Sequence, residues 1–149
     1  IHVCNYNQLT NLDVSKNIGL THLYCASNQL MNLDISENLC LRNLYCNYNQ
    51  LANLDVSKNT GLRDLNCDSN QLTNLDISKN IILTYLHCSL NQLKNLNLKN
   101  ANNINLRGFF IDFTKNPNLE CIQVDDPDYS NINWATSKDT TSSYNTSCK

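Results

Sequence analysis

Residues 23–40 read LYCASNQLMNLDISENLC, and one repeat later residues 44–61 read LYCNYNQLANLDVSKNTG. The two segments keep three leucines, one cysteine and three asparagines in place. The cysteine recurs at a constant interval of 21 residues, at Cys4, Cys25, Cys46, Cys67 and Cys88. A fixed period of this length indicates a repeat architecture, in which each unit is stable only when it stacks on its neighbours.

Asparagines divide each 21-residue unit into two similar halves, L-x-x-L-x-C-x-x-N-Q and L-x-N-L-D-[VI]-S-[KE]-N. Their spacing alternates between 10 and 11 residues, at Asn7, Asn17, Asn28, Asn38, Asn49, Asn59, Asn70, Asn80 and Asn91. Apolar and polar residues alternate within each half, which is typical of a half-buried strand, and neither half is long enough for a helix. We therefore predict a solenoid whose 21-residue coils each carry two short strands, with a buried asparagine at each corner that bonds open backbone groups.

The two strands of each coil predict two parallel sheets, which we name sheet A and sheet B. Sheet A is expected at 2–4, 23–25, 44–46, 65–67, 86–88, 104–106 and 122–124. Sheet B is expected at 12–14, 33–35, 54–56, 75–77, 96–98 and 111–113. The last range follows because residues 111–116 match residues 54–59. The fold class predicted is a parallel β-solenoid of about six coils over residues 1–124, with an irregular coil at 99–110, little or no helix, and a C-terminal cap over 125–149.

Composition excludes several partners of this 149-residue chain. Lys and Arg number 11 against 13 Asp and Glu, with no basic stripe to neutralise phosphates, so we expect no nucleic-acid partner. No apolar run approaches the roughly 20 residues that span a bilayer, so we expect no membrane insertion. We expect a monomer. The chain opens in mid-repeat at IHVC, so the lack of a leader says little about compartment.

The pattern L-x-x-L-x-[LC]-x-x-N-x-L resembles the leucine-rich repeat signature. The nested arrangement of 10 and 11 residues, with Cys in the first half and L-D-x-x-x-N in the second, resembles the bacterial nested (IRREKO) class. Residues 1–103 match this pattern well and 111–124 less fully, whereas His2 stands where a buried leucine belongs. The resemblance implies a parallel-stranded superhelix used for binding, commonly in bacterial proteins that are secreted or displayed at the cell surface.

The five regularly spaced cysteines are expected to point into the core as small apolar side chains. A zinc site needs four ligands around one point, whereas this ladder offers a line of thiols. Strand spacing of about 4.8 Å also exceeds the usual Cβ separation of a disulfide, although strained disulfides or a metal stay open as alternatives. Cys40 lies in a turn where sister repeats carry Gly19, Gly61 and Ile82, and its role stays open.

Cys121 and Cys148 bracket a repeat-free tail that holds the chain's only tryptophan. A bridge between them would tie the tail over the last coil, with Tyr129, Ile132 and Trp134 covering its core. This arrangement resembles the disulfide-closed C-terminal cap of secreted leucine-rich repeat proteins. Such a pairing implies an oxidising compartment.

The polar strand positions face outward, and the two sheets differ in what they present there. Sheet B repeats Asn-x-Asp in almost every coil, whereas the corresponding positions of sheet A diverge. If the repeats arose by duplication, divergent positions either drift freely or are selected for contact. Neighbouring aromatic and hydrogen-bonding groups suit recognition of a protein or a glycan. The candidate ligand-binding residues are Tyr24, Tyr45, Asn66 and His87 in one row and His22, Asn43, Asp64 and Tyr85 beside it.

Other functions fit less well. The aspartates of sheet B (Asp13, Asp34, Asp55 and Asp76) form a straight row, which gives calcium too few ligands around one point. No carboxylate is expected to orient a histidine beside a nucleophile, so we predict no catalytic residue, no cofactor and no metal site. A regular threonine ladder for ice binding is also missing. The sequence predicts a non-enzymatic module that binds a protein, with glycan adhesion as the nearest alternative and a structural spacer without a ligand as the third.

Overall fold

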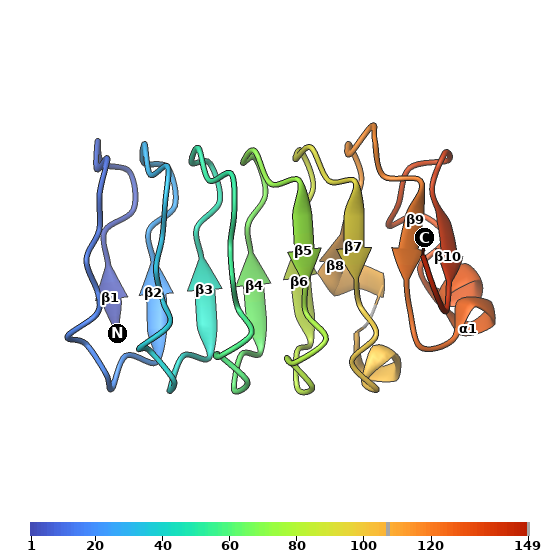
Figure 1. Ribbon diagram of the computed structural model, residues 1–149, viewed down its shortest axis with the longest axis horizontal. Helices are drawn as coiled ribbons and strands as arrows, with labels where there is room; N and C mark the ends of the chain where they lie inside the picture. The colour runs from blue at the N-terminus through green and yellow to red at the C-terminus, as the bar shows by residue number, and fades with distance from the viewer. Residues whose placement is uncertain (107, 149) are drawn as a thin grey trace.

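The computed structural model, which describes residues 1–106 and 108–148, is a parallel β-solenoid of about seven turns with almost no helix. The coils follow one another along the long axis from the N-terminus to the C-terminus (Figure 1). The predicted fold class is confirmed. There is about one turn more than the six expected, because the last strand of the chain adds another turn to the stack.

Sheet A is a six-stranded parallel sheet that runs through almost the whole solenoid. Its strands pair equivalent residues of successive coils, so that Leu23, Leu44 and Leu65 lie side by side beneath the surface. In spatial order they are β1 (His2–Val3), β2 (His22–Tyr24), β3 (Asn43–Tyr45), β4 (Asp64–Asn66), β6 (Tyr85–His87) and β8 (Ile111–Asp112). The ladder continues through the cysteine position, since Cys25 N–H donates to Tyr45 O at 2.8 Å.

Sheet B is shorter than predicted. Its four strands, in spatial order, are β10 (Ser143–Asn145), β9 (Cys121–Gln123), β7 (Asn95–Asn97) and β5 (Asn74–Asp76). The strands expected at 12–14, 33–35 and 54–56 are not formed. In these coils side chains connect neighbouring turns instead: Asn38 Nδ2 donates to Val14 O and Asn17 O, both at 2.9 Å.

Three strand assignments near the C-terminus were wrong. Residues 111–112 belong to sheet A, residues 121–123 belong to sheet B, and residues 104–106 overlap a short 3-10 helix, η1 (Asn103–Asn105), followed by η2 (Gly108–Phe110). Both halves of the repeat share the pattern apolar-x-apolar-x-x-Asn, so the sequence of 111–116 fits either one. The backbone decides, because Lys115 has a positive φ of 59°. Apart from Ala101 in the irregular coil, positive φ is otherwise found at the residue before the asparagine of first halves, as at Ser27 and Ser69.

One continuous core fills the space between the two sheets. Its leucines and the cysteines Cys25, Cys46, Cys67 and Cys88 are fully buried, whereas Cys4 at the end of the stack is partly exposed. All five ladder thiols are free, as is the exposed Cys40. Phe113 takes the cysteine's position in the next coil, and with it the ladder ends.

The first-half asparagines form the corner contacts that we expected. Asn49 Nδ2 donates to Cys25 O and Cys46 O at 3.0 Å, and its Oδ1 accepts from Leu30 N at 3.0 Å. A single buried side chain thus connects three backbone groups of neighbouring coils. Second-half asparagines use only their amino group: Asn59 Nδ2 donates to Ile35 O and Asn38 O, while its buried Oδ1 has no partner among the described residues.

The C-terminal segment closes the core with the helix α1 (Pro127–Asn133) and strand β10. Trp134 is fully buried, packs against Phe113 and Tyr144, and donates from Nε1 to Leu106 O at 2.9 Å. Tyr129 packs partly against the core, as expected. Ile132 was expected to cover the core as well, but it is 80% exposed because it lies on the outer side of α1.

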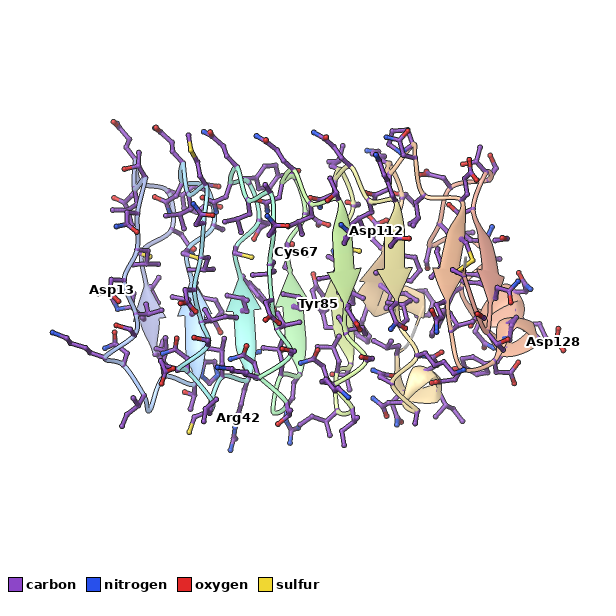
Figure 2. The ribbon with its side chains drawn as sticks, in the orientation of Figure 1. Asp13, Arg42, Cys67, Tyr85, Asp112 and Asp128 are labelled. Atoms are coloured by element: carbon purple, nitrogen blue, oxygen red, sulfur yellow. A yellow bond between two sulfur atoms is a disulfide. The ribbon has the colours of Figure 1, made fainter. Side chains whose placement is uncertain are left out.

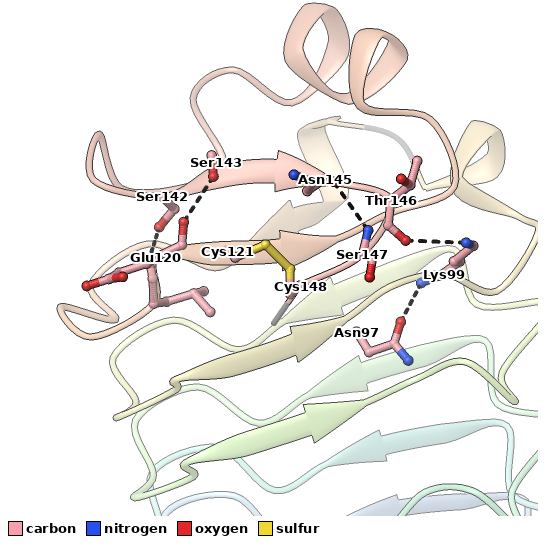
Figure 3. The surroundings of a disulfide bond; sticks show 11 residues. Asn97, Lys99, Glu120, Cys121, Ser142, Ser143, Asn145, Thr146, Ser147 and Cys148 are labelled. Carbon is pink, nitrogen blue, oxygen red and sulfur yellow. Dashed lines mark hydrogen bonds between the residues drawn. A yellow bond between two sulfur atoms is a disulfide. The ribbon is translucent and has the colours of Figure 1, made fainter.

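A disulfide joins Cys121 of β9 to Cys148 just beyond β10, with a Cα–Cα distance of 5.8 Å (Figure 3). The expected bridge is therefore present. Beside it Lys99 Nζ donates to Thr146 O at 3.3 Å, which adds a second tie between the tail and the solenoid (Figure 3). In the described part of the chain no helix has the length and apolar character needed to cross a membrane.

Candidate functional site

The candidate ligand-binding residues lie together on the outer face of sheet A, in the two rows that strand register imposes. His22, Asn43, Asp64 and Tyr85 align across β2, β3, β4 and β6. Two residues further along each strand Tyr24, Tyr45, Asn66 and His87 align in the same way. All eight are partly exposed, because alternation along a strand turns the intervening leucines into the core.

Aromatic rings connect the two rows into one surface, which we call the aromatic strip and which consists of His22, Tyr24, Tyr45, Tyr85, His87 and Phe110. Tyr24 and Tyr45 meet edge to face with ring centroids 5.2 Å apart. Tyr45 and Tyr85 stack across β4 at 6.1 Å, and Tyr85 stacks closely on His87 at 4.4 Å. Aromatic pairs at these distances stabilise one another, so the rings are held in place before any ligand arrives.

Phe110 extends the strip beyond the predicted residues. It comes from η2, lies with its ring centroid 6.4 Å from that of Tyr85, and is 49% exposed. Sequence reasoning missed it because the irregular coil at 99–110 has no repeat period that would place its side chains. The neighbouring Phe109 is 98% exposed, so an apolar edge borders the strip at this end.

A hollow of about 440 Å³ opens on this surface. Its lining residues are Tyr45, Asp64, Thr84, Tyr85, Asn105 and Phe110. Three aromatic rings and three polar groups therefore surround one space whose volume falls within the range of small-ligand sites.

Asp64 is the charged group of the hollow. Burial raises the pKa of its carboxyl group, against the opposing effects of the Asn43 hydrogen bond and of Arg63 and His22. The same burial raises the pKa of the Tyr45 and Tyr85 hydroxyls, and the Asp64 charge raises both further. These directions indicate that a carboxylate and two phenols share a partly dehydrated environment.

A carboxylate that we did not expect also lies beside His87. Asp68 Oδ2 is 3.4 Å from His87 Nδ1, an ion pair when the histidine is protonated, and Asp68 Oδ1 accepts from Ser89 N. Nothing in the sequence indicated this contact between a carboxylate and a histidine. Among the described residues no hydroxyl or thiol hydrogen-bonds to the His87 ring, so this pair has no adjacent nucleophile to activate.

The outer face of the second half-repeats, which includes sheet B, has a different character. Each aspartate of its row is engaged locally: Asp34 Oδ1 accepts from Ser36 N and Asp55 Oδ1 from Ser57 N, both at 2.9 Å. These hydrogen bonds lower the pKa of both carboxyl groups. Hollows of about 270 and 350 Å³ lie between successive coils, each lined by the same Asn, Asp, Ser and Lys set. Within the described residues no group of three or more His, Cys, Asp or Glu is arranged to hold a metal.

The fold and this surface define a class, a leucine-rich-repeat-like β-solenoid with an internal cysteine ladder. Among solved structures the chain is similar to the functional domain of InlJ from Listeria monocytogenes, which is described as including a cysteine ladder. The match has 33% sequence identity and a TM-score of 0.68, and it covers 81% of this chain but only 28% of the other. Comparison with protein-family models gives no match, and comparison with curated protein sequences gives none.

Proposed function

We propose that this chain is a non-enzymatic binding module that recognises a protein partner through the outer face of sheet A. The aromatic strip carries the proposal, since partly exposed Tyr side chains held by stacking supply contact area at little entropic cost. The uniform face of sheet B offers no comparable variety of groups. Similarity to InlJ supports the repeat fold and cysteine ladder that carry this face, and the nested repeat class remains part of this proposal.

We also propose an extracellular location, secreted or at a bacterial cell surface, and a monomeric state. The location is supported by the Cys121–Cys148 disulfide, because such bonds persist in oxidising compartments. It also agrees with the similarity to a Listeria protein domain. We further propose that the chain divides into a solenoid over residues 1–124 and a cap over 125–149.

Glycan binding is the second candidate. The observation that favours it is the hollow itself, where Tyr and Phe rings stand beside the hydrogen-bonding groups of Asp64, Thr84 and Asn105. Sugars present apolar ring faces and many hydroxyls, so such a mixture suits them. A spacer without a ligand is the third candidate, and it gives the aromatic strip no role in binding.

Capture from an extract of surface proteins and glycans tests the proposal. The chain is compared with a variant carrying Tyr24→Ala, Tyr45→Ala, Tyr85→Ala and His87→Ala, and with a control carrying Asn11→Ala, Asn32→Ala and Asn53→Ala on the exposed face of the other half-repeats. Circular dichroism and urea unfolding show that all three are folded. A protein retained by the chain and the control, but lost by the aromatic variant, supports the proposal. Equal capture of a protein by the chain and both variants contradicts the proposal. Capture of glycans alone favours the second candidate.

A further inference from the structure

We infer that the hollow beside Tyr85 receives a basic side chain, arginine or lysine, of the protein partner. This inference rests on the proposed function and specifies the chemistry of the ligand at one point of the surface. Three aromatic rings, those of Tyr45, Tyr85 and Phe110, line the hollow together with the carboxylate of Asp64. A cation gains from both kinds of group, through attraction to ring faces and through charge-assisted hydrogen bonds to a carboxylate.

The charge around the hollow is complementary to such a guest. Asp64, Asp68 and Asp112 all project from the sheet A side of the coils between β4 and β8. The outward strand positions of β2, β3, β4 and β6 carry no lysine or arginine. Arg42 instead projects from the edge of the solenoid (Figure 2), and Arg63 occupies the equivalent position of the next coil, before β4 begins.

The energetic argument concerns Asp64. Its carboxylate is partly withdrawn from water, and burial disfavours its charged form. Asn43 donates one hydrogen bond to Oδ2. Electrostatic interactions with Arg63 and His22 also favour the charged form of the carboxylate. A guanidinium or ammonium group that enters the hollow pairs with the carboxylate and offsets the free-energy cost of its partial burial. A neutral guest does not offset that cost. The aromatic walls also bind the methylene groups of either side chain.

The test uses ¹⁵N-labelled intact chain titrated with N-acetyl-arginine amide and, as a neutral isostere, N-acetyl-citrulline amide. We expect the arginine probe to shift the amide signals of Asp64, Thr84 and Tyr85 with millimolar affinity, at least fivefold tighter than citrulline. Asp64→Asn should weaken the arginine probe at least fivefold and leave citrulline unchanged. Asp34→Asn in the second half-repeats is the matched control, because Asn97 at the equivalent position already makes the same turn contact with Lys99 N.

Three results would overturn the inference: equal binding of both probes, no shift at these amides with the arginine probe, or binding of methyl glucoside there that is insensitive to Asp64→Asn. Binding of the captured protein partner distinguishes a failure of this inference from a failure of the proposed function. A partner that the Asp64→Asn chain retains and the aromatic variant loses refutes the basic guest and leaves recognition by sheet A standing. A partner retained by both refutes recognition by sheet A itself.

Discussion

The cysteine of each coil illustrates how one side chain serves the stack. Cys25, Cys46, Cys67 and Cys88 lie one above another, are fully buried and remain free thiols. A thiol is small and weakly polar, so it fills this position without requiring a hydrogen-bond partner. The recurrence of cysteine is therefore a packing requirement of the narrow space between the sheets.

Replacing Cys46 by serine tests this interpretation. Cys46 is fully buried, and within residues 1–106 and 108–148 its thiol has no side-chain hydrogen-bond partner. A hydroxyl there would be buried unpaired, so we expect Cys46→Ser to lower the free energy of unfolding by about 2 kcal/mol. Urea denaturation under reducing conditions measures the change. Cys40→Ser, at an exposed thiol, should stay within about 0.5 kcal/mol of the unmodified chain. Equal stability of both variants would refute the packing role.

The ladder also predicts how stability depends on pH. Burial raises the pKa of Cys25 from its ordinary value of 9.0 to about 12, and raises that of Cys46, Cys67 and Cys88 well above 9.0. The unfolded chain therefore loses these protons first, and stability should be complete below about pH 9 and fall as the pH rises from 9 towards 12. Each thiol contributes a slope of up to about 1.4 kcal/mol per pH unit.

Unfolding with urea from about pH 8 to about pH 10.5 measures this slope, with Cys46→Ala as the matched comparison. The variant starts from a lower stability but should lose it less steeply, since one buried thiol fewer takes part. Tyr144 adds to the slope in both proteins, because burial also raises the pKa of its hydroxyl group. A stability independent of pH in this range, or the same slope in both proteins, would contradict the prediction.

Among the structural elements, the two corners of each coil are built differently. The first-half corner has a residue with positive φ, such as Tyr48, followed by an asparagine that uses both its amino and its carbonyl group. The second-half corner begins with an Asp whose carboxylate accepts from the following Ser, and its asparagine uses the amino group alone. The first corner therefore contributes more to the stacking of coils.

This difference predicts that Asn49→Ala destabilises the protein more than Asn59→Ala. Asn49→Ala removes three hydrogen bonds and leaves Leu30 N without a partner, although Cys25 O and Cys46 O still accept from Asn28 and Asn70. Asn59→Ala removes two hydrogen bonds, and both carbonyl groups keep a backbone donor. At about 1 kcal/mol for each lost bond, the expected losses are roughly 3 and 2 kcal/mol. Urea unfolding of both variants measures them. A larger loss for Asn59→Ala would show that the unpartnered Oδ1 is not a weakness of that corner.

The cap is the second element with a measurable role. The bridge between Cys121 and Cys148 closes a loop with a sequence separation of 27 residues, and chain-entropy arguments give it about 3.5 kcal/mol. We expect Cys121→Ser with Cys148→Ser to lose about that much stability. Amide hydrogen exchange should then rise in β9 and β10 before it rises in β2, β3 and β4, because the cap is at the end of the stack. Uniform acceleration through all coils would contradict a local capping role.

The molecule as a whole could be predicted from the sequence only as far as its period extends. The 21-residue repeat fixed which residues of β2, β3, β4 and β6 face the core and which face outward. It did not determine the sheet to which residues 111–112 belong, because the two half-repeats share one apolar pattern and only backbone geometry at Lys115 separates them. Sheet B was predicted longer than it is because apolar alternation marks buried and exposed positions whether or not the backbone forms a ladder, and asparagine side chains such as Asn38 connect the first coils instead.

The candidate site was predictable where its residues lie on the regular strands of sheet A. Strand alternation was enough to place Tyr24, Tyr45 and Tyr85 on one face. The participation of Phe110 depends on how the irregular coil crosses the edge of sheet A, and the contact between Asp68 and His87 depends on side-chain conformations in neighbouring coils. Neither is encoded in a period, so only three-dimensional coordinates reveal them.

The central claim is that sheet A is the recognition surface, and hydrogen exchange of the complex with the captured protein partner tests it most directly. We predict that binding slows exchange in β2, β3, β4 and β6 and around Phe110, and leaves β5 and β7 unchanged. Mass spectrometry of the peptides that cover these strands resolves the two faces. Protection confined to β5, β7 and the cap, with none in β2 to β4, would contradict the account.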